Sequence, residues 1–71
     1  MDKKRDFADR LKELREEGEY NMTQIAKGIG VTQTTIMRWE AGLRKPLLEQ
    51  AVQLAKFFDV TVGYMAGVED M

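Results

Sequence analysis

The sequence predicts an all-α domain of five helices. Apolar residues recur at intervals of three and four, the spacing that lines one face of a helix. No stretch sustains the apolar and polar alternation of a half-buried strand over a useful length. Most helical stretches are also bounded by residues suited to helix ends. With 71 residues, the chain is expected to form one domain over residues 1–71.

The bounds of the five expected helices come from these end residues. The helices cover residues 3–17, 22–29, 33–41, 46–58 and 62–66. Asn21, Thr32 and Thr61 precede three of them, where a side-chain oxygen can accept a backbone N–H of the first turn. Pro46 opens the fourth helix, and the others are closed by Gly18, Gly30, Gly42 and Gly67. The fourth helix is expected to face the core with Leu47, Leu48, Ala51, Val52, Leu54, Ala55 and Phe58.

The composition excludes several kinds of function. The chain has no cysteine and no histidine, which excludes disulfides, thiolate zinc sites, thiol nucleophiles and imidazole bases. No apolar run is long enough to span a bilayer, so we expect a cytoplasmic protein without membrane contact. Glu16, Glu17 and Glu19 form an acidic cluster, but so small a helical chain has little room for a pocket that shifts pKa values. We therefore expect no enzyme, no cofactor, no metal and no small-molecule ligand.

Charge is unevenly distributed along the chain. The net charge is −1 and the pI is about 5.4, which by themselves argue against nucleic acid. Residues 22–46, however, hold four basic residues against one acidic residue, whereas residues 47–71 hold one basic residue against four acidic ones. Any anion that the chain binds is expected to meet its middle third.

The second and third helices are predicted to form a helix-turn-helix over residues 22–41. Ala26 is small enough for the two helices to cross closely, and Gly30 permits the sharp turn between them. Ile36 and Trp39 are expected to hold the third helix on the core. At about 100° per residue, Thr35 and Glu40 share that inward face.

The outward face of the third helix carries side chains that can read DNA. It consists of Gln33, Thr34, Met37, Arg38 and Ala41. Glutamine can pair with adenine N6 and N7, arginine with guanine O6 and N7, and threonine can offer a hydroxyl or touch a thymine methyl. An ordinary solvated helix face is the alternative for these residues taken alone.

The loop from Gly42 to Pro46 is a candidate phosphate site. Its backbone amides, and those at the start of the fourth helix, can hold phosphates, while Arg44 and Lys45 add positive charge. A plain solvated basic turn is the alternative.

The pattern LKELREE…IAKGIGVTQTTIMRWEAGLRKP…LAKFFDVTVGYMAG resembles the lambda-repressor-like, or Xre-type, DNA-binding domain of phage repressors and bacterial regulators. The resemblance runs over residues 7–67. It implies a compact five-helix fold whose third helix, residues 33–41, is the recognition helix. It also implies base contacts from Gln33, Thr34 and Arg38, with Met37 as an apolar contact.

The resemblance implies further roles outside the recognition helix. Arg15 and Glu40 match an ion pair that joins the first helix to the end of the third. Phosphate contacts are expected from Asn21, Thr23, Gln24, Thr35, Leu43, Arg44 and Lys45. The final helix packs against a twofold mate in relatives, which implies a homodimer interface at Val62, Tyr64 and Met65. Intrachain core is the alternative for these three residues.

Two residues depart from the family pattern. Met22 stands where many relatives have a glutamine that contacts phosphate and braces the recognition helix, so Asn21, Thr23 or Gln24 is expected to replace it. Gly28 is unusual because glycine costs about 1 kcal/mol against alanine inside a helix. Either it permits a close approach of another element, or it is simply tolerated there.

These observations predict a sequence-specific transcriptional regulator that binds double-stranded DNA. A repressor that binds a palindromic operator as a homodimer, with its recognition helices in the major groove, is the expected form. An antitoxin-like or coactivator-like protein-interaction module is the alternative.

Overall fold

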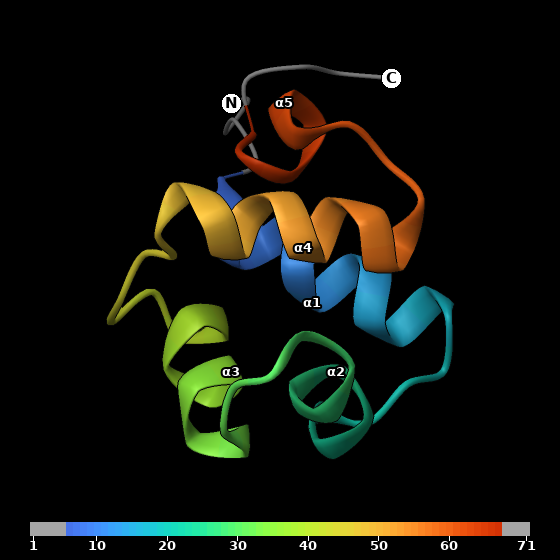
Figure 1. Cartoon of the computed structure of the whole chain (residues 1–71). Helices are drawn as coiled ribbons and strands as arrows, with labels where there is room; N and C mark the ends of the chain where they lie inside the picture. The colour runs from blue at the N-terminus through green and yellow to red at the C-terminus, as the bar shows by residue number, and fades with distance from the viewer. Residues whose placement is uncertain (1–5, 68–71) are drawn as a thin grey trace, which may run out of the picture.

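The computed structural model describes residues 6–67, which form five helices joined by short loops (Figure 1). The helices are α1 (Phe7–Glu17), α2 (Met22–Ile29), α3 (Gln33–Glu40), α4 (Leu48–Phe58) and α5 (Val62–Met65). The described residues contain no strand, which confirms the all-α prediction. Figure 1 shows α2 and α3 side by side at one end of the domain and α5 at the other, with α1 and α4 between them.

Helix α1 begins at Phe7, whereas the sequence predicted a start at residue 3. Asp6 has an extended backbone and its side chain accepts the Asp9 N–H at 3.1 Å, so it is the N-cap. Residues 3–5 of the predicted helix lie outside the described residues. At the other end Gly18 is the C-cap, as predicted.

Side-chain caps fix both helices of the motif. Asn21 and Gln24 each accept the other's backbone N–H at 2.8 Å, which closes a capping box at the start of α2. Gly30 then turns the chain with a φ of 78°, a left-handed conformation that glycine adopts at little cost. Thr32 accepts the Thr35 N–H at 3.1 Å and starts α3. The last helical residue is Glu40, one residue before the predicted end.

The prediction for the start of α4 was wrong. The helix begins at Leu48, two residues after Pro46, because Leu47 keeps an extended backbone with a ψ of 158°. The side-chain oxygen of Gln50 accepts the Leu47 N–H at 2.9 Å and holds it there. Leu47 and Leu48 consequently project into solvent, 67% and 74% exposed, and do not line the core as expected.

All five helices contribute to one buried core. Its largest fully buried side chains are Leu11, Ile25, Ile36, Trp39, Leu54 and Met65. The ring of Phe7 meets Trp39 edge to face, with centroids 5.8 Å apart, so α1 packs directly on α3. Helix α3 is therefore packed on the core through Trp39.

Gly28 permits the close approach that its place in a helix suggested. A Cβ atom added there would lie 2.4 Å from Phe57 Cε2 of α4. The ring of Phe57 is held in turn by Tyr20 and Phe58, at centroid distances of 5.0 and 5.1 Å. Glycine thus lets α4 pack against α2 through an aromatic cluster.

The short helix α5 follows Thr61, whose side chain accepts the Tyr64 N–H at 3.0 Å. It ends at Met65, one residue earlier than expected, with Ala66 as its C-cap. None of the helices within residues 6–67 is long and apolar enough to cross a membrane.

Candidate nucleic-acid interface

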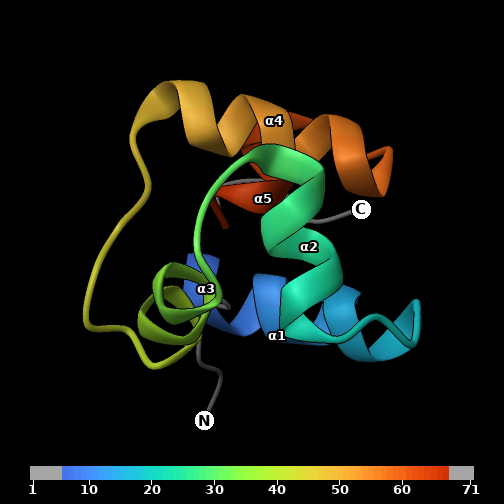
Figure 2. The same cartoon turned by 60° about the horizontal axis from the view of Figure 1, so that its bottom comes forward.

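Helix α3 has the two faces that its sequence spacing predicted. Ile36 and Trp39 are buried, Thr35 is half-buried beside them, and the side chain of Glu40 is largely buried. The opposite face exposes Gln33, Thr34, Met37 and Arg38, and Met37 is 51% exposed. Figure 2 brings α2 and α3 to the front and shows that no other helix covers this side of α3. A flat or grooved partner can therefore reach these side chains.

An ion pair holds the C-terminal end of α3 against α1. Arg15 Nε donates to Glu40 Oε2 at 2.6 Å, and Arg15 Nη2 donates to Oε1 at 2.9 Å. Both side chains are largely buried, 18% and 7% exposed. These hydrogen bonds raise the pKa of Arg15 above its ordinary value, so the guanidinium stays charged. Two parallel bonds fix direction as well as distance, which sets the angle of α3 on the domain.

A second contact holds the N-terminal end of α3 against α2. Thr23 Oγ1 donates to Gln33 Oε1 at 3.3 Å. Met22 is half-buried against the core, and its side chain has no hydrogen-bond donor to offer DNA. In many relatives the first residue of α2 is expected to contact the recognition helix. Here that contact is made by the second residue, Thr23.

The loop after α3 offers fewer backbone amides than the sequence suggested. The N–H groups of Ala41, Gly42 and Leu43 donate to the carbonyls of Met37, Trp39 and Arg38. Because its amide is already bonded at 2.9 Å, Leu43 is not available as a backbone donor to phosphate. Its side chain is apolar and 74% exposed. Leu43 therefore offers a phosphate neither its amide nor a polar side chain, contrary to the prediction.

The start of α4 supplies donors in place of Leu43. Leu47 has no side-chain oxygen, and in the described part of the chain nothing caps the first amides of α4, those of Leu48 and Glu49. Arg44 and Lys45 are exposed next to them. A cleft of about 280 Å³ lies between α3 and this end of α4, lined by Thr35, Arg38, Trp39, Arg44, Lys45, Leu47 and Gln50. Arg44 and Lys45 line this cleft, and the uncapped amides follow them in the chain, an arrangement suited to an anion.

The expected phosphate residues of α2 and α3 differ in what they can still donate. Asn21 and Gln24 use their side-chain oxygens in the capping box, which leaves their amide nitrogens as donors. Thr35 Oγ1 shares a hydrogen bond with Thr32 Oγ1 at 2.9 Å. Thr23 gives its hydroxyl hydrogen to Gln33.

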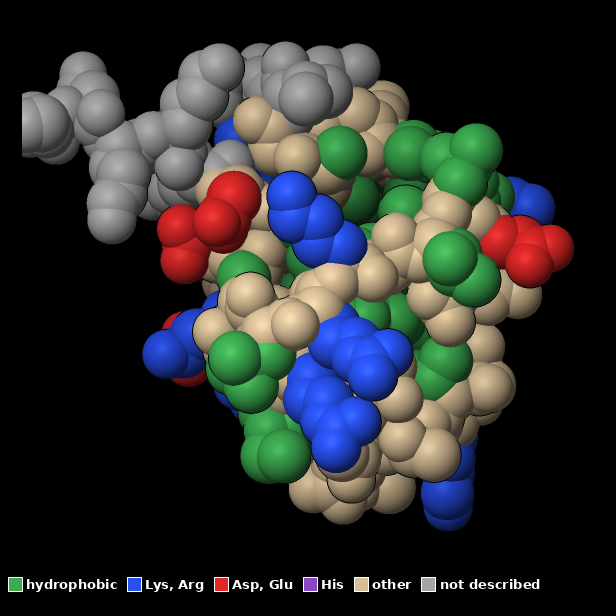
Figure 3. Space-filling view, turned by 90° about the vertical axis from the view of Figure 1, so that its left-hand side faces the viewer, with side chains coloured by type: hydrophobic (Ala, Val, Ile, Leu, Met, Phe, Trp, Pro, Cys, Tyr) green, Lys and Arg blue, Asp and Glu red, His purple; other side chains and the backbone are tan. Residues whose placement is uncertain are grey.

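Positive charge gathers on the face between α3 and α4. Figure 3 looks onto this face and shows Lys and Arg side chains at its centre, flanked by hydrophobic side chains, with acidic ones only toward its edges. The local field is thus favourable to an anion although the whole chain is slightly acidic.

The three residues predicted for a dimer interface are placed differently from one another. Met65 is fully buried within its own chain, so its side chain cannot meet a second copy. The ring of Tyr64 is half-buried, with Arg10 Cζ 4.1 Å above its centroid. Val62 is half-buried and lines an open groove.

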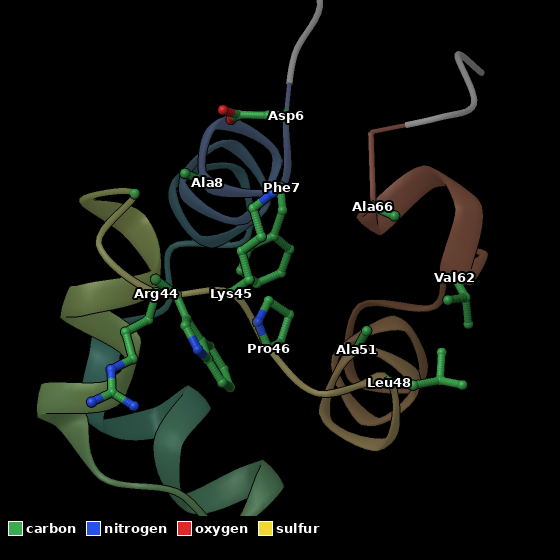
Figure 4. Close-up of a pocket in the computed structure, with 12 residues that line it drawn as sticks. Asp6, Phe7, Ala8, Arg44, Lys45, Pro46, Leu48, Ala51, Val62 and Ala66 are labelled. Atoms are coloured by element: carbon green, nitrogen blue, oxygen red, sulfur yellow. The ribbon is translucent and has the colours of Figure 1, made fainter.

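That groove is apolar and has a volume of about 370 Å³. Figure 4 shows Phe7 and Pro46 on one side of it and Val62 and Ala66 on the other, with Ala51 and Leu48 of α4 beside them. The side chain of Arg44 extends away from the groove. The apolar surface is continuous with the exposed Leu48, which the sequence prediction had assigned to the core.

Comparison with known proteins identifies the family. The family model described as helix-turn-helix matches residues 11–65. The chain is 36% identical over 64 residues to the uncharacterized HTH-type transcriptional regulator YobD of Bacillus subtilis (strain 168), an alignment that covers 90% of this chain and 57% of YobD. It is 38% identical over 56 residues to the cryptic phage CTXphi transcriptional repressor RstR of Vibrio cholerae, covering 79% of this chain and 50% of RstR.

The fold is shared with a solved phage repressor. The P22 c2 repressor, crystallised with a synthetic operator, superposes with a TM-score of 0.86 at 20% identity, covering 92% of this chain and 98% of that chain. The chain spans about half the length of the curated relatives that it matches. The family match and these relatives together show that the chain belongs to the lambda-repressor-like, or Xre-type, helix-turn-helix family.

Proposed function

We propose that the chain is a transcriptional regulator that binds double-stranded DNA, with α3 in the major groove. The observation that carries the proposal is the exposed face of α3, held at both ends by the Arg15–Glu40 pair and the Thr23–Gln33 bond. A helix fits the major groove, and side chains of its first turns reach base edges. Gln33, Thr34 and Arg38 are the proposed base contacts, with Met37 available to a thymine methyl.

Phosphate contacts on either side of α3 orient the domain. At one side stand the uncapped amides of α4 with Arg44 and Lys45, and at the other stand the amide nitrogens of Asn21 and Gln24. Such contacts fix the position of a protein on DNA without reading its sequence. Thr35 lines the same cleft as Arg38, Arg44 and Lys45, and its hydroxyl can accept or donate there.

We further propose that two copies bind a palindromic operator. The apolar groove beside Val62, together with the exposed Leu48, is the surface that a second copy would cover. Two recognition helices on one face of DNA would then enter major grooves about 34 Å apart. Repression is the proposed outcome because RstR, a relative at 38% identity, is named a transcriptional repressor.

Selection from a random duplex pool at near-physiological salt tests this proposal, with titration of the enriched duplexes at several protein concentrations. Enrichment of two inverted half-sites, with steep dependence on protein concentration, is the expected result. If the chain is folded but enriches no sequence, the proposed function is overturned.

An antitoxin-like or coactivator-like interaction module is the second candidate. The observation in its favour is the same apolar groove, which a different protein could fill. DNA binding distinguishes the two candidates. A regulator should bind a selected duplex more tightly than a scrambled one, whereas a module that acts only on proteins should show no such difference.

A further inference from the structure

Helix α5 is too short to keep its place by itself. It has four residues, Val62–Met65, whereas isolated helices shorter than about 12–15 residues are marginal in water. Its position therefore depends on side-chain contacts with the rest of the domain. Met65 is fully buried in the core and anchors one side of the helix. Methionine is flexible and adapts to irregular gaps, so this contact alone specifies the orientation of α5 poorly.

Arg10 of α1 supplies a second contact, and this one has a direction. Its Cζ lies 4.1 Å from the centroid of the Tyr64 ring. Arg10 is only 4% exposed, so the guanidinium and the ring meet largely out of water. The attraction between a cation and the face of an aromatic ring is stronger there than at an exposed site. Because the guanidinium is planar and rigid, the contact restricts how the ring, and with it α5, can turn.

The two helices joined by this contact lie on opposite sides of the apolar groove. Phe7, at the start of α1, lies on one side, and Val62 and Ala66 lie on the other (Figure 4). Arg10 follows Phe7 by three residues, which is about one helical turn, and Tyr64 lies between Val62 and Ala66 in the chain. The contact between Arg10 and Tyr64 thus connects the two sides of the groove close to the residues that line it.

We infer that Arg10 is a positioning residue for the surface that a second copy covers. Through Tyr64 it holds α5 against α1 and so sets the spacing between the two sides of the groove. The inference rests on the proposed function and names a residue of α1 on which the pairing of two copies depends. Arg10 is too deeply buried to form that interface itself, so it acts through α5 and not by direct contact with the second copy.

Binding to duplexes with one and with two selected half-sites tests the inference. The ratio of the two affinities in gel shifts measures pairing, whereas the affinity for one half-site reports on the DNA-reading face alone. Arg10→Met removes the cation and keeps an apolar stem, and Tyr64→Leu removes the ring. Each should lower the ratio about tenfold and change the affinity for one half-site by less than about twofold. Tyr64→Phe keeps the ring and should match the wild type, as should Lys12→Met, which removes an exposed cation from the same helix.

A double variant shows whether the two residues act through one contact. Arg10→Met combined with Tyr64→Leu should lower the ratio no further than either change alone, because both remove the same interaction. Losses that multiply to about a hundredfold in the double variant would overturn the inference and leave the proposed function intact. An unchanged ratio in Arg10→Met, with the variant shown to be folded by circular dichroism, would do the same.

Two further outcomes complete the test. If Arg10→Met is unfolded at the assay temperature, the comparison of Tyr64→Leu with Tyr64→Phe decides, and equal ratios for these two would overturn the inference. If the wild-type chain binds the two-site duplex without cooperativity, the proposed pairing fails and the inference fails with it.

Discussion

Arg15 and Glu40, which are 25 residues apart in the chain, form an ion pair with two hydrogen bonds of 2.6 and 2.9 Å between α1 and the end of α3. Each lies beside apolar core residues, Leu11 and Leu14 on one helix and Ile36 and Trp39 on the other. The pair is polar but sits where packing also joins the two helices. It therefore couples the stability of the domain to the orientation of the recognition helix.

Arg15→Ala should destabilise the domain by about 3 kcal/mol, because the largely buried Glu40 carboxylate is left without its partner. Thermal unfolding followed by circular dichroism measures the change. Lys12→Ala, which removes an exposed cation from the same helix, is the matched control and should change stability by less than about 0.5 kcal/mol. Equal melting temperatures for Arg15→Ala and the control would refute a structural role for the pair.

The contribution of this pair should not depend on pH near neutrality. The pKa of Arg15 is raised in the folded chain, chiefly because Glu40 accepts its hydrogen bonds. A raised pKa means that the stabilisation is complete below the pKa of arginine in the unfolded chain and is lost only as pH rises through the folded value. Both lie in strongly alkaline solution. The coupling energy between Arg15→Met and Glu40→Leu should thus be equal at pH 6 and pH 9, and a fall by half at pH 9 would contradict this assignment.

Gly28→Ala should destabilise the domain by about 1 kcal/mol, although alanine is the better helix former. Alanine gains about 1 kcal/mol of helix propensity, but its Cβ would lie 2.4 Å from Phe57 Cε2, and overpacking costs about 1–3 kcal/mol. Urea unfolding measures the difference. In a Phe57→Leu background the same change should cost less, since the ring is gone. A Gly28→Ala chain that is more stable than the wild type would show that the ring moves aside freely.

Arg44→Ala should weaken binding to all duplexes by a similar factor. It removes a cation next to the uncapped start of α4, and such contacts act on phosphate. The slope of log affinity against log salt should fall by about one. Fluorescence anisotropy on a selected and a scrambled duplex measures both quantities. An effect confined to the selected duplex would instead place Arg44 at a base.

Leu48→Gln should weaken binding to a duplex with two half-sites by at least about tenfold and leave a single half-site unaffected, because it makes the proposed dimer surface polar. Lys56→Gln, an exposed change near the other end of α4, is the control. Concentration-dependent gel shifts distinguish one bound copy from two. An unchanged dependence on protein concentration would move the dimer surface elsewhere.

The sequence was sufficient for the helices and for the faces of α3, because both depend on local signals. Asn21, Thr32 and Thr61 cap the helices that follow them, and the period of the apolar residues separates the buried Ile36 and Trp39 from the exposed Arg38. The start of α4 was placed too early because proline is equally suited to a helix start and to the turn before one. In the structure, Gln50 accepts the Leu47 N–H and keeps Pro46 and Leu47 outside the helix. The sequence alone does not show that this hydrogen bond forms.

Contacts that depend on a single hydrogen bond could not be predicted from the sequence. Nothing in the spacing of Thr23 and Gln33 shows that a hydroxyl of α2 reaches the amide of α3, since this depends on how the two helices cross. The bonded amide of Leu43 and the buried position of Met65 likewise follow from loop geometry and from how α5 docks. Both residues match the family pattern by position, yet neither offers the group that the pattern implied.

The ratio of affinities for a selected duplex and a scrambled duplex of equal length, measured for the wild-type chain at about 0.15 M salt, tests the central claim most directly. If the exposed face of α3 reads base edges, the selected duplex should bind at least about 10³-fold more tightly, as specific DNA-binding proteins do. A ratio near one, with both affinities falling equally as salt rises, would show that the chain binds only phosphates and that α3 reads no sequence.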